Sequence, residues 1–398
     1  MNGGILTMPA GSRMAGPTEI VVNDGAVNLL GEIATMPDSI TVPAANSLTL
    51  GSDVTVKRYI VGGVPQADGT YTVGGHTLTV ASGLATVWQG ASGGNWSETA
   101  NWTGGVADGA SATADFGASS TLGGGGSVVL DANVMLGKLA FANNVTGTTL
   151  TVSGTATLTM GGGAEIWVGE GQTLVIAAPL AQTQGYLYKK GQGRLVVNGS
   201  ITGASNGAGY YFLVMEGEME VNGTVRNSRL WASNNDGIHE PRIIIGAQAD
   251  IGSYSSVHPA WKVETDKSGD NGHAVQNGGT VDCNPPAYGF ANRMFAFAHF
   301  SGGVGSYTLN DGTLNLYRGF HNFVIEYGTG TFNFLQNGGT FNTWGFFLSH
   351  AGANGATTSY TLNDGTLILQ TRLFAEGSGT THMALNGGTV LSETSPVL

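Results

Sequence analysis

One short phrase recurs along this chain at a spacing that few folds allow. The residues YTLNDGTL occupy positions 307–314 and again 360–367, and a looser copy, FLQNGGTF, lies at 334–341. Aligned on their Asn-Gly or Asn-Asp-Gly turns, five copies place the first Asn at spacings of 33, 27, 26 and 23 residues, at Asn277, Asn310, Asn337, Asn363 and Asn386. Self-similarity at about 20 to 50 residues is typical of a solenoid.

Each copy lies within a longer unit that has a constant internal order. A first strand, a Gly-rich corner, a second strand, the Asn turn and a third strand follow one another, as in residues 323–343. Apolar and polar residues alternate in these strands, and the spacing of the apolar residues does not favour helices. The pattern predicts an all-β chain that folds as a right-handed parallel β-helix with roughly 20–33 residues per coil.

Two quantities follow from this prediction. At ~25 residues per coil the whole chain would form on the order of 16 coils, each about 4.8 Å from the next, and a rod roughly 75 Å long. An antiparallel sandwich is the alternative fold, because Asn-Gly also forms type I′ hairpins.

The composition agrees with a β-solenoid and excludes one class of binding partner. The 398 residues include 66 Gly and 41% hydrophobic residues but only 11% charged residues, which is too Gly-rich for most globular domains and too apolar for disorder. The net charge of −12, with 15 Lys and Arg, provides no basic stripe for nucleic acid.

Cys283 is the only cysteine, so no intrachain disulfide can form. No run approaches the roughly 18 apolar residues of a membrane span, and we expect no export signal within this chain.

Three further stretches carry recurring residues. Residues 186–221 combine a Lys-Gly corner with two strands, through Lys190, Gly191, Gly193, Leu195, Val197, Gly203, Gly217, Met219 and Val221. Residues 87–117 contain repeated Asn-Trp pairs, namely Asn95, Trp96, Asn101 and Trp102, after Trp88. Residues 54–73 are marked by Gly63, Gln66, Gly69, Thr70 and Tyr71.

Through these residues the chain resembles the bacterial autotransporter-associated β-strand repeat proteins, a family of long, Gly-rich, surface or secreted β-helices. The resemblance implies that residues 186–221 are a core repeat, that 87–117 open a module and that 54–73 close one. It also implies a structural, non-enzymatic protein at a bacterial cell surface or outside the cell. We therefore expect N-terminal coils and a closing segment over 1–85, an opening segment over 86–125 and a main β-helix over 126–398.

The order of these parts leads to a hypothesis about assembly. The closing segment precedes the opening segment, and residues 1–8 and 22–30 have the phase of the coils that end the chain. Stacking the C-terminal end of one copy on the N-terminal end of the next would restore the order opening, coils, closing. The hypothesis is a head-to-tail fibre whose assembly ends contain Asn2, Gly3, Gly4, Asn386, Gly387 and Gly388. The alternative is one segment of a longer tandem array, with neighbouring modules as partners.

One stretch raises the question of catalysis. Asp236, His239, Glu240 and Arg242 lie within seven residues, and β-helical polysaccharide hydrolases place carboxylates about a sugar bond. No second acidic coil follows at one-coil spacing, so we interpret the stretch as a corner and loop. A carbohydrate-binding or carbohydrate-cleaving β-helix remains the alternative function, with these residues or an outward-facing aromatic strip in the C-terminal half as its site.

A column of ionisable residues is also predicted. Stacked coils would align His299, Glu326, His350 and Glu376, one residue per coil. The column is either a charge-compensated polar ladder or a metal site, and the spacing of about 4.8 Å between strands favours the ladder, because the ligands of one zinc lie about 2 Å from it. We expect no cofactor, although Asn-Asp-Gly corners could hold calcium weakly.

Overall fold

The computed structural model describes most of the chain, and every structural statement below concerns those residues. They are 5–11, 13–14, 19–22, 24–33, 39–56, 58–62, 64–66, 69–80, 85–103, 105–143, 145–183, 185–204, 210–233, 239–252, 256–259, 271–283, 296–297, 303–316, 324–325, 330–347, 355, 357–374 and 379–392.

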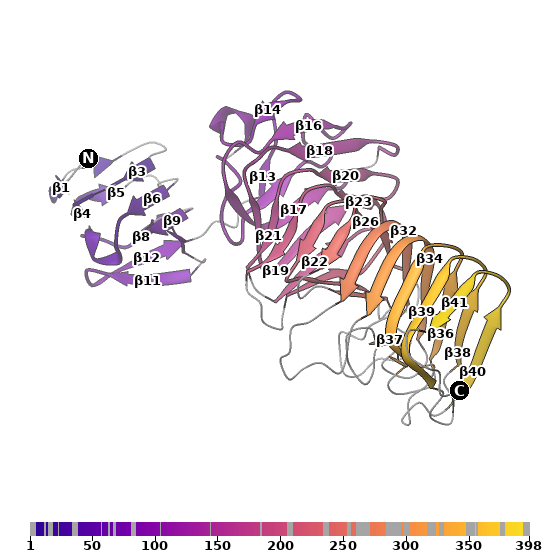
Figure 1. Cartoon of the computed structure of the whole chain (residues 1–398). Helices are drawn as coiled ribbons and strands as arrows, with labels where there is room; N and C mark the ends of the chain where they lie inside the picture. Colours follow the sequence, from indigo (N-terminus) through magenta and orange to yellow (C-terminus); the bar gives the residue numbers. More distant parts are fainter. Residues whose placement is uncertain are drawn as a thin grey trace.

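The larger part of the described chain is a β-solenoid. It runs from β13 (Ala85–Val87) to β41 (Thr389–Ser392) and has about 11 turns of about 24 residues each (Figure 1). Every ladder between its described strands is parallel, so the predicted parallel β-solenoid is confirmed and the antiparallel sandwich is excluded. The estimate of 16 coils is wrong, because strands up to β12 (His76–Val80) form separate sheets.

The solenoid strands fall into three columns. The first contains β13, β15 (Thr113–Asp115), β22 (Tyr186–Lys190), β25 (Tyr211–Val214), β28 (Arg229–Ala232) and β31 (Ser256–Pro259). The second contains β16 (Gly126–Val129), β18 (Thr149–Ser153), β20 (Thr173–Ile176), β23 (Arg194–Val197), β26 (Glu218–Val221), β29 (Arg242–Ile245), β36 (Thr331–Gln336), β38 (Thr357–Leu362) and β40 (Thr380–Leu385). The third contains β21 (Leu180–Gln182), β24 (Ile201–Gly203), β27 (Thr224–Arg226), β30 (Asp250–Gly252) and β41. Some strands bend through two columns, namely β17 (Val134–Phe141), β19 (Leu158–Val168), β32 (Asn271–Cys283), β34 (Val304–Leu316), β37 (Thr340–Phe347) and β39 (Thr366–Phe374).

The core is a continuous stack of equivalent apolar side chains. In the second column Val128, Val152, Ile176, Val197 and Val221 are paired in register and fully buried. Alternate residues of a strand point to opposite faces, so one side chain in two enters the core of every turn. Each turn therefore covers the apolar face of the turn before it.

The Asn turn of the repeated phrase is a corner between the second and third columns. Asn310 donates from Nδ2 to Oδ1 of Asn277 at 2.9 Å, and Asn337 and Asn363 continue the same ladder at 2.9 Å each. The Gly at the end of the turn is also required: Gly365 has φ +92°, and a Cβ there would lie 2.5 Å from the carbonyl oxygen of Gly339. A residue with a side chain would be strained in φ and would meet the neighbouring backbone.

The two versions of the phrase are complementary. Tyr360 in one coil donates its hydroxyl to Oε1 of the fully buried Gln336 in the coil before it, at 2.6 Å. Tyr307 does the same to Gln276 at 2.7 Å. The coils with Tyr and Leu therefore alternate with coils with Gln, because each tyrosine hydroxyl supplies a donor for a buried amide oxygen.

The N-terminal stack, which we define as residues 5–80, repeats this plan on a smaller scale. Strands β1 (Ile5–Met8), β4 (Ala26–Leu29) and β7 (Leu48–Leu50) are parallel, as are β3 (Glu19–Val21), β6 (Ser39–Val42) and β9 (Arg58–Val61). Its buried residues, which include Val27, Leu29 and Ile40, form a core cluster separate from that of the solenoid. Two hydrophobic cores therefore lie along the chain.

The last strands of the N-terminal stack reverse direction. Strand β10 (Val64–Pro65) pairs antiparallel with β9, and β11 (Gly69–Val73) pairs antiparallel with β12. Tyr59 packs on Tyr71 with ring centroids 5.8 Å apart. These hairpins end the run of parallel strands, and none of the described large apolar side chains of β10–β12 is exposed, so we call this end of the stack closed.

A tryptophan cluster closes the first turn of the solenoid. Trp88 and Trp96 both pack against Trp102, with ring centroids 5.0 and 4.9 Å apart, and Phe116 lies 5.5 Å from Trp102. Each indole N–H reaches a backbone carbonyl; Trp96, for example, donates to Ala107 at 2.9 Å. These rings cover the apolar side of the first turn and satisfy their own polar atoms.

Candidate functional site: the open ends of the two stacks

The remaining two ends of the stacks have no cover among the described residues. Strand β1 pairs only with β4, whereas β40 and β41 pair only with β38 and β39, respectively. Each of these edges therefore presents backbone groups and side chains with no neighbouring strand. We call these surfaces the open ends: β1 for the N-terminal stack, and β40 with β41 for the solenoid.

Exposed apolar side chains are concentrated on these two surfaces. Ten large hydrophobic side chains are exposed in the described chain, and six of them belong to the open ends: Ile5, Leu6, Met383, Leu385, Val390 and Leu391. Unpaired strand edges with apolar side chains are templates for association with another strand.

Comparison with the adjacent turn shows why these side chains are exposed. Leu385 is 55% exposed, but Leu362, its partner in register one turn earlier, is fully buried. Val390 is 44% exposed and is paired with the buried Leu367. In the N-terminal stack Leu6 is 45% exposed beside the buried Val27. The same inward-facing position is thus buried when a further turn covers it.

The predicted assembly residues are partly described. Asn386 extends the amide ladder by donating to Asn363 at 2.8 Å, and Gly388 has φ +76° as in the turns before it. Gly387 lies between them at the corner that leads into β41. Asn2, Gly3 and Gly4 lie outside the described residues.

The predicted acidic and basic stretch is described only from His239 onward, and that part contains one of its two carboxylates. Glu240 lies 3.7 Å from Nε2 of His273, and burial lowers the pKa of that histidine, while Glu240 acts in the opposite direction. His239 is described in the same loop, and Arg242 begins β29 with its side chain exposed. Asp236 lies outside the described residues.

The predicted ladder or metal column is not among the described residues. His299, Glu326, His350 and Glu376 all lie outside them, so both interpretations stay predictions. Within the described part, no three His, Cys, Asp or Glu side chains gather closely enough to hold a metal ion. Of the predicted aromatic strip, Phe332 and Phe334 have described side chains, and both are buried in the core.

The Lys-Gly corner contains a buried lysine that was not predicted from the sequence. Lys189, one residue before the lysine singled out above, is fully buried, and its Nζ donates to the carbonyl oxygens of Gly193 at 2.6 Å and Glu216 at 2.8 Å, and also to Gly191. Burial lowers the pKa of Lys189 to about 7, and Glu216 and Glu218 act in the opposite direction. Alternation along β22 was the available signal, because it turns Lys189 inward and Lys190 outward.

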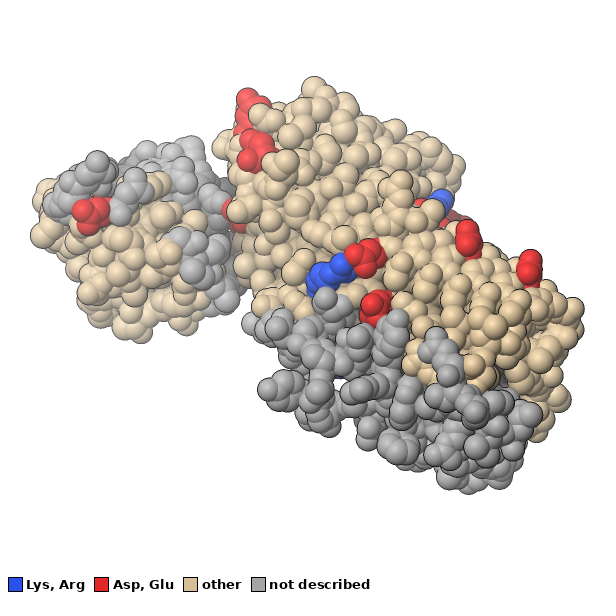
Figure 2. Space-filling model, in the orientation of Figure 1, with Lys and Arg blue, Asp and Glu red and all other residues tan. Residues whose placement is uncertain are grey.

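Charge is sparse on the surface. Figure 2 shows one face on which acidic and basic side chains are scattered among uncharged ones. None of the described residues belongs to a helix with the length and apolar character that a membrane crossing would require.

Comparison of the chain with protein-family models, curated proteins and solved structures finds no match. The resemblance to autotransporter-associated repeats therefore stays a prediction.

Proposed function

We propose that this chain is a structural β-solenoid unit that joins head to tail into a fibre. In this proposal β40 and β41 of one copy contact β1 of the next. The observation that carries it is the contrast between ends: each stack is closed at one end and open at the other, and the open ends belong to the first and last described strands. Contact between two different surfaces of identical chains does not close into a ring by itself, and its repetition gives a fibre.

The two open ends have matching phase. Asn386-Gly387-Gly388 precedes β41, and the sequence Asn2-Gly3-Gly4 precedes β1. Aligning the two triplets places Val390 opposite Leu6. Both residues occupy inward-facing positions, because each is paired in register with a buried residue of its own stack. Burying such a side chain contributes about 1.5–3 kcal/mol.

The proposed setting is a bacterial cell surface or the extracellular space, with no catalytic role. This part rests on the resemblance to autotransporter-associated repeats. A rigid stack with few charges and a Gly- and Asn-rich coat is suited to such a structural role.

A substitution at one open end tests the assembly. We expect the unmodified chain to form filaments in negative-stain images and large species in sedimentation velocity. Val390→Asp should give single units, because it places a carboxylate in the apolar contact. Val145→Asp is the matched control, since Val145 is 51% exposed at a corner of the solenoid side and lies away from both open ends.

The outcomes separate the alternatives. Short monodisperse rods for both the unmodified chain and Val145→Asp at high concentration would contradict head-to-tail assembly. That result would favour a segment whose open ends are covered by neighbouring modules of a longer chain.

A further inference from the structure

A column of asparagines runs along one corner of the solenoid, with a single interruption. The residue that follows the second-column strand is Asn in seven of eight successive turns, and the exception is glycine: Asn198, Asn222, Gly246, Asn277, Asn310, Asn337, Asn363 and Asn386. Where two asparagines are adjacent, the Nδ2 of one donates to the Oδ1 of the one before it, at 2.8–3.0 Å. All of these bonds run in the same direction along the stack.

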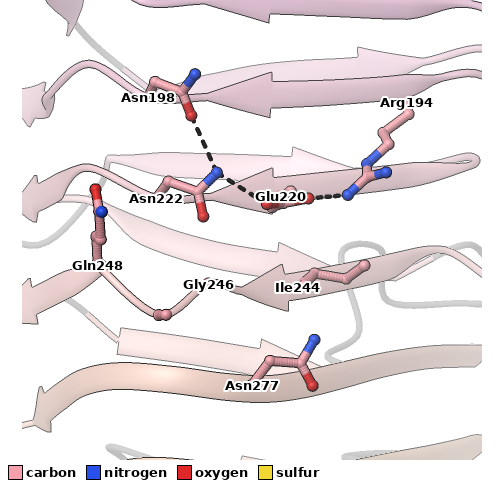
Figure 3. Close-up of a pocket in the computed structure, with 9 residues that line it drawn as sticks. Arg194, Asn198, Glu220, Asn222, Ile244, Gly246, Gln248 and Asn277 are labelled. Atoms are coloured by element: carbon pink, nitrogen blue, oxygen red, sulfur yellow. Dashed lines mark hydrogen bonds and ion pairs between the residues drawn. The ribbon is translucent and has the colours of Figure 1, made fainter.

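The interruption leaves one acceptor and one donor unused. Asn222 donates from Nδ2 to Asn198 at 3.0 Å and to Oε1 of Glu220 at 2.8 Å, which orients its Oδ1 toward Gly246. Asn277 accepts at Oδ1 from Asn310, so its Nδ2 points away from Asn310, toward the turn that contains Ile244 and Gly246. Neither the Oδ1 of Asn222 nor the Nδ2 of Asn277 has a hydrogen-bond partner among the described residues. Figure 3 shows these two atoms on facing sides of the gap.

The gap opens into a cavity of about 740 Å³. Its remaining lining is mostly polar: Arg194 is ion-paired with Glu220, Asn198 and Gln248 add amides, and Ile244 and Ala247 supply the apolar groups. The corner is wider here, because residues 246–249 form a turn closed by a bond from the Ala249 N–H to the Gly246 carbonyl at 3.1 Å. The site is thus a polar, solvent-open groove.

We infer that this groove binds the acetamido group of an N-acetylated hexosamine. A secondary amide has an N–H donor on one edge and a carbonyl acceptor on the opposite edge, which match the free Oδ1 of Asn222 and the free Nδ2 of Asn277. The ligand amide lies between these two atoms and outside the Cβ position that Gly246 lacks, because the Oδ1 of Asn222 already fills that position. Its methyl group contacts Ile244 or Ala247. Asn198, Gln248 and the Arg194–Glu220 pair bind sugar hydroxyls.

The character of the lining favours a neutral sugar over the other ligands that carry amides. An extended peptide would need pockets for alternate side chains, whereas the lining here offers only two apolar residues. The charge of Arg194 is already neutralised by Glu220, and its Nε lies 3.1 Å from Oε1 of Glu218. Arg194 therefore does not favour an anionic sugar.

Binding of two disaccharides to the full chain tests the inference. We expect N,N′-diacetylchitobiose to bind with a dissociation constant of about 1 mM or lower in a saturation-transfer NMR titration. Cellobiose has the same linkage without acetamido groups and should bind at least about tenfold more weakly, a difference of about 1.4 kcal/mol. Equal binding of the two disaccharides, or tighter binding of N-acetylglycine N-methylamide, would overturn the assignment.

Substitutions in the groove test whether chitobiose binds there. Gly246→Asn should restore the ladder and weaken chitobiose binding at least about tenfold, with the melting temperature kept or raised. Its Cβ would lie 1.8 Å from the Oδ1 of Asn222, the mobile end of a side chain that can rotate back into the ladder. Gln248→Ala, an exposed turn substitution, should weaken binding several-fold without affecting folding, and so keeps the test valid if Gly246→Asn folds poorly.

The matched control breaks the ladder elsewhere. Asn337→Gly removes an asparagine from the column at a distant turn, outside the groove lining, and should not weaken chitobiose binding at Gly246. If Asn337→Gly weakened binding as much as Gly246→Asn, the effect would reflect the ladder as a whole and the assigned site would be wrong.

Discussion

The two ends of the solenoid are built from the same kind of turn but differ in what covers them. At the first turn, Trp88, Trp96 and Trp102 fold over the apolar face and are at most 5% exposed. At the last turn, Met383 and Leu385 occupy equivalent inward-facing positions and are 36% and 55% exposed. The N-terminal stack shows the reverse arrangement, with an open first strand and antiparallel hairpins at its final turn. A parallel stack can therefore accept further turns indefinitely. It ends only where a covering element blocks the strand edge.

The largest effect on stability is expected at the closed end. Trp96→Ala should lower the free energy of unfolding by about 3–5 kcal/mol, because it removes a fully buried indole from the cluster and leaves a cavity. Urea denaturation followed by circular dichroism measures this change. A loss below about 1 kcal/mol would show that the cluster does not close the first turn in the sense proposed here.

Between the two ends, the buried Lys189 should make the free energy of unfolding depend on pH. Its pKa is about 7 in the folded chain, against an ordinary value of 10.5, so between these values the unfolded chain binds more protons. The free energy of unfolding should therefore rise from about pH 7 to about pH 10.5, by at most about 1.4 kcal/mol per pH unit. Below pH 7 the cost of the buried charge is fully present and this group adds no further slope.

Two methionine variants isolate this contribution. Lys189→Met should remove the rise, whereas Lys190→Met should keep it, because Lys190 is partly exposed and ion-paired with Glu165. Denaturation midpoints between pH 6 and pH 10 provide the measurement. Parallel pH profiles for the two variants would refute the assignment.

A smaller effect is expected at the buried Tyr360 hydroxyl, one turn before the open end. Tyr360→Phe leaves Oε1 of Gln336 without its donor and should cost about 1–3 kcal/mol. Tyr188→Phe is the control, because Tyr188 faces outward on β22 and is only half-buried, and it should change stability by less than about 0.5 kcal/mol. Equal effects of the two variants would mean that the Tyr–Gln pairing does not stabilise the alternating coils.

The smallest effect is expected at the open end itself. In a dilute sample of single units, Leu385→Ala should change the free energy of unfolding by less than about 0.5 kcal/mol, whereas Leu362→Ala one turn earlier should cost about 2–5 kcal/mol. If both substitutions cost the same in single units, β40 would be covered within its own chain, and the contrast between closed and open ends would fail. In the assembled fibre, the Leu385→Ala variant should instead weaken association.

Much of the fold could be predicted from the sequence because a solenoid repeats its local rules. The spacing of the Asn turns predicted the turn length, and alternation within the strands predicted that one side chain in two faces inward. Leu309 and Leu314, for example, are buried in this way. The error in coil number arose because the N-terminal strands obey the same local pattern but form their own sheets. Local pattern does not reveal where one stack of turns ends and another begins.

The sites were less predictable. Asp236, His239, Glu240 and Arg242 are chemically reactive and close in sequence, but Asp236 lies outside the described residues, so a catalytic role for this stretch stays a prediction. The groove at Gly246 and the burial of Lys189 were not predicted, because each depends on the residues of the neighbouring turns.

The sequence by itself determined the repeating turn: its length, its strands, its Asn corner and the glycine that the corner's positive φ requires. These properties depend on residues within one turn, where spacing and backbone preference are sufficient. The tertiary structure alone decided what happens between turns, including the match of Tyr360 to Gln336, the unused amide groups on either side of Gly246 and the exposure of Leu385. Those features depend on residues about 24 positions apart along the chain that only the winding places about 4.8 Å from one another.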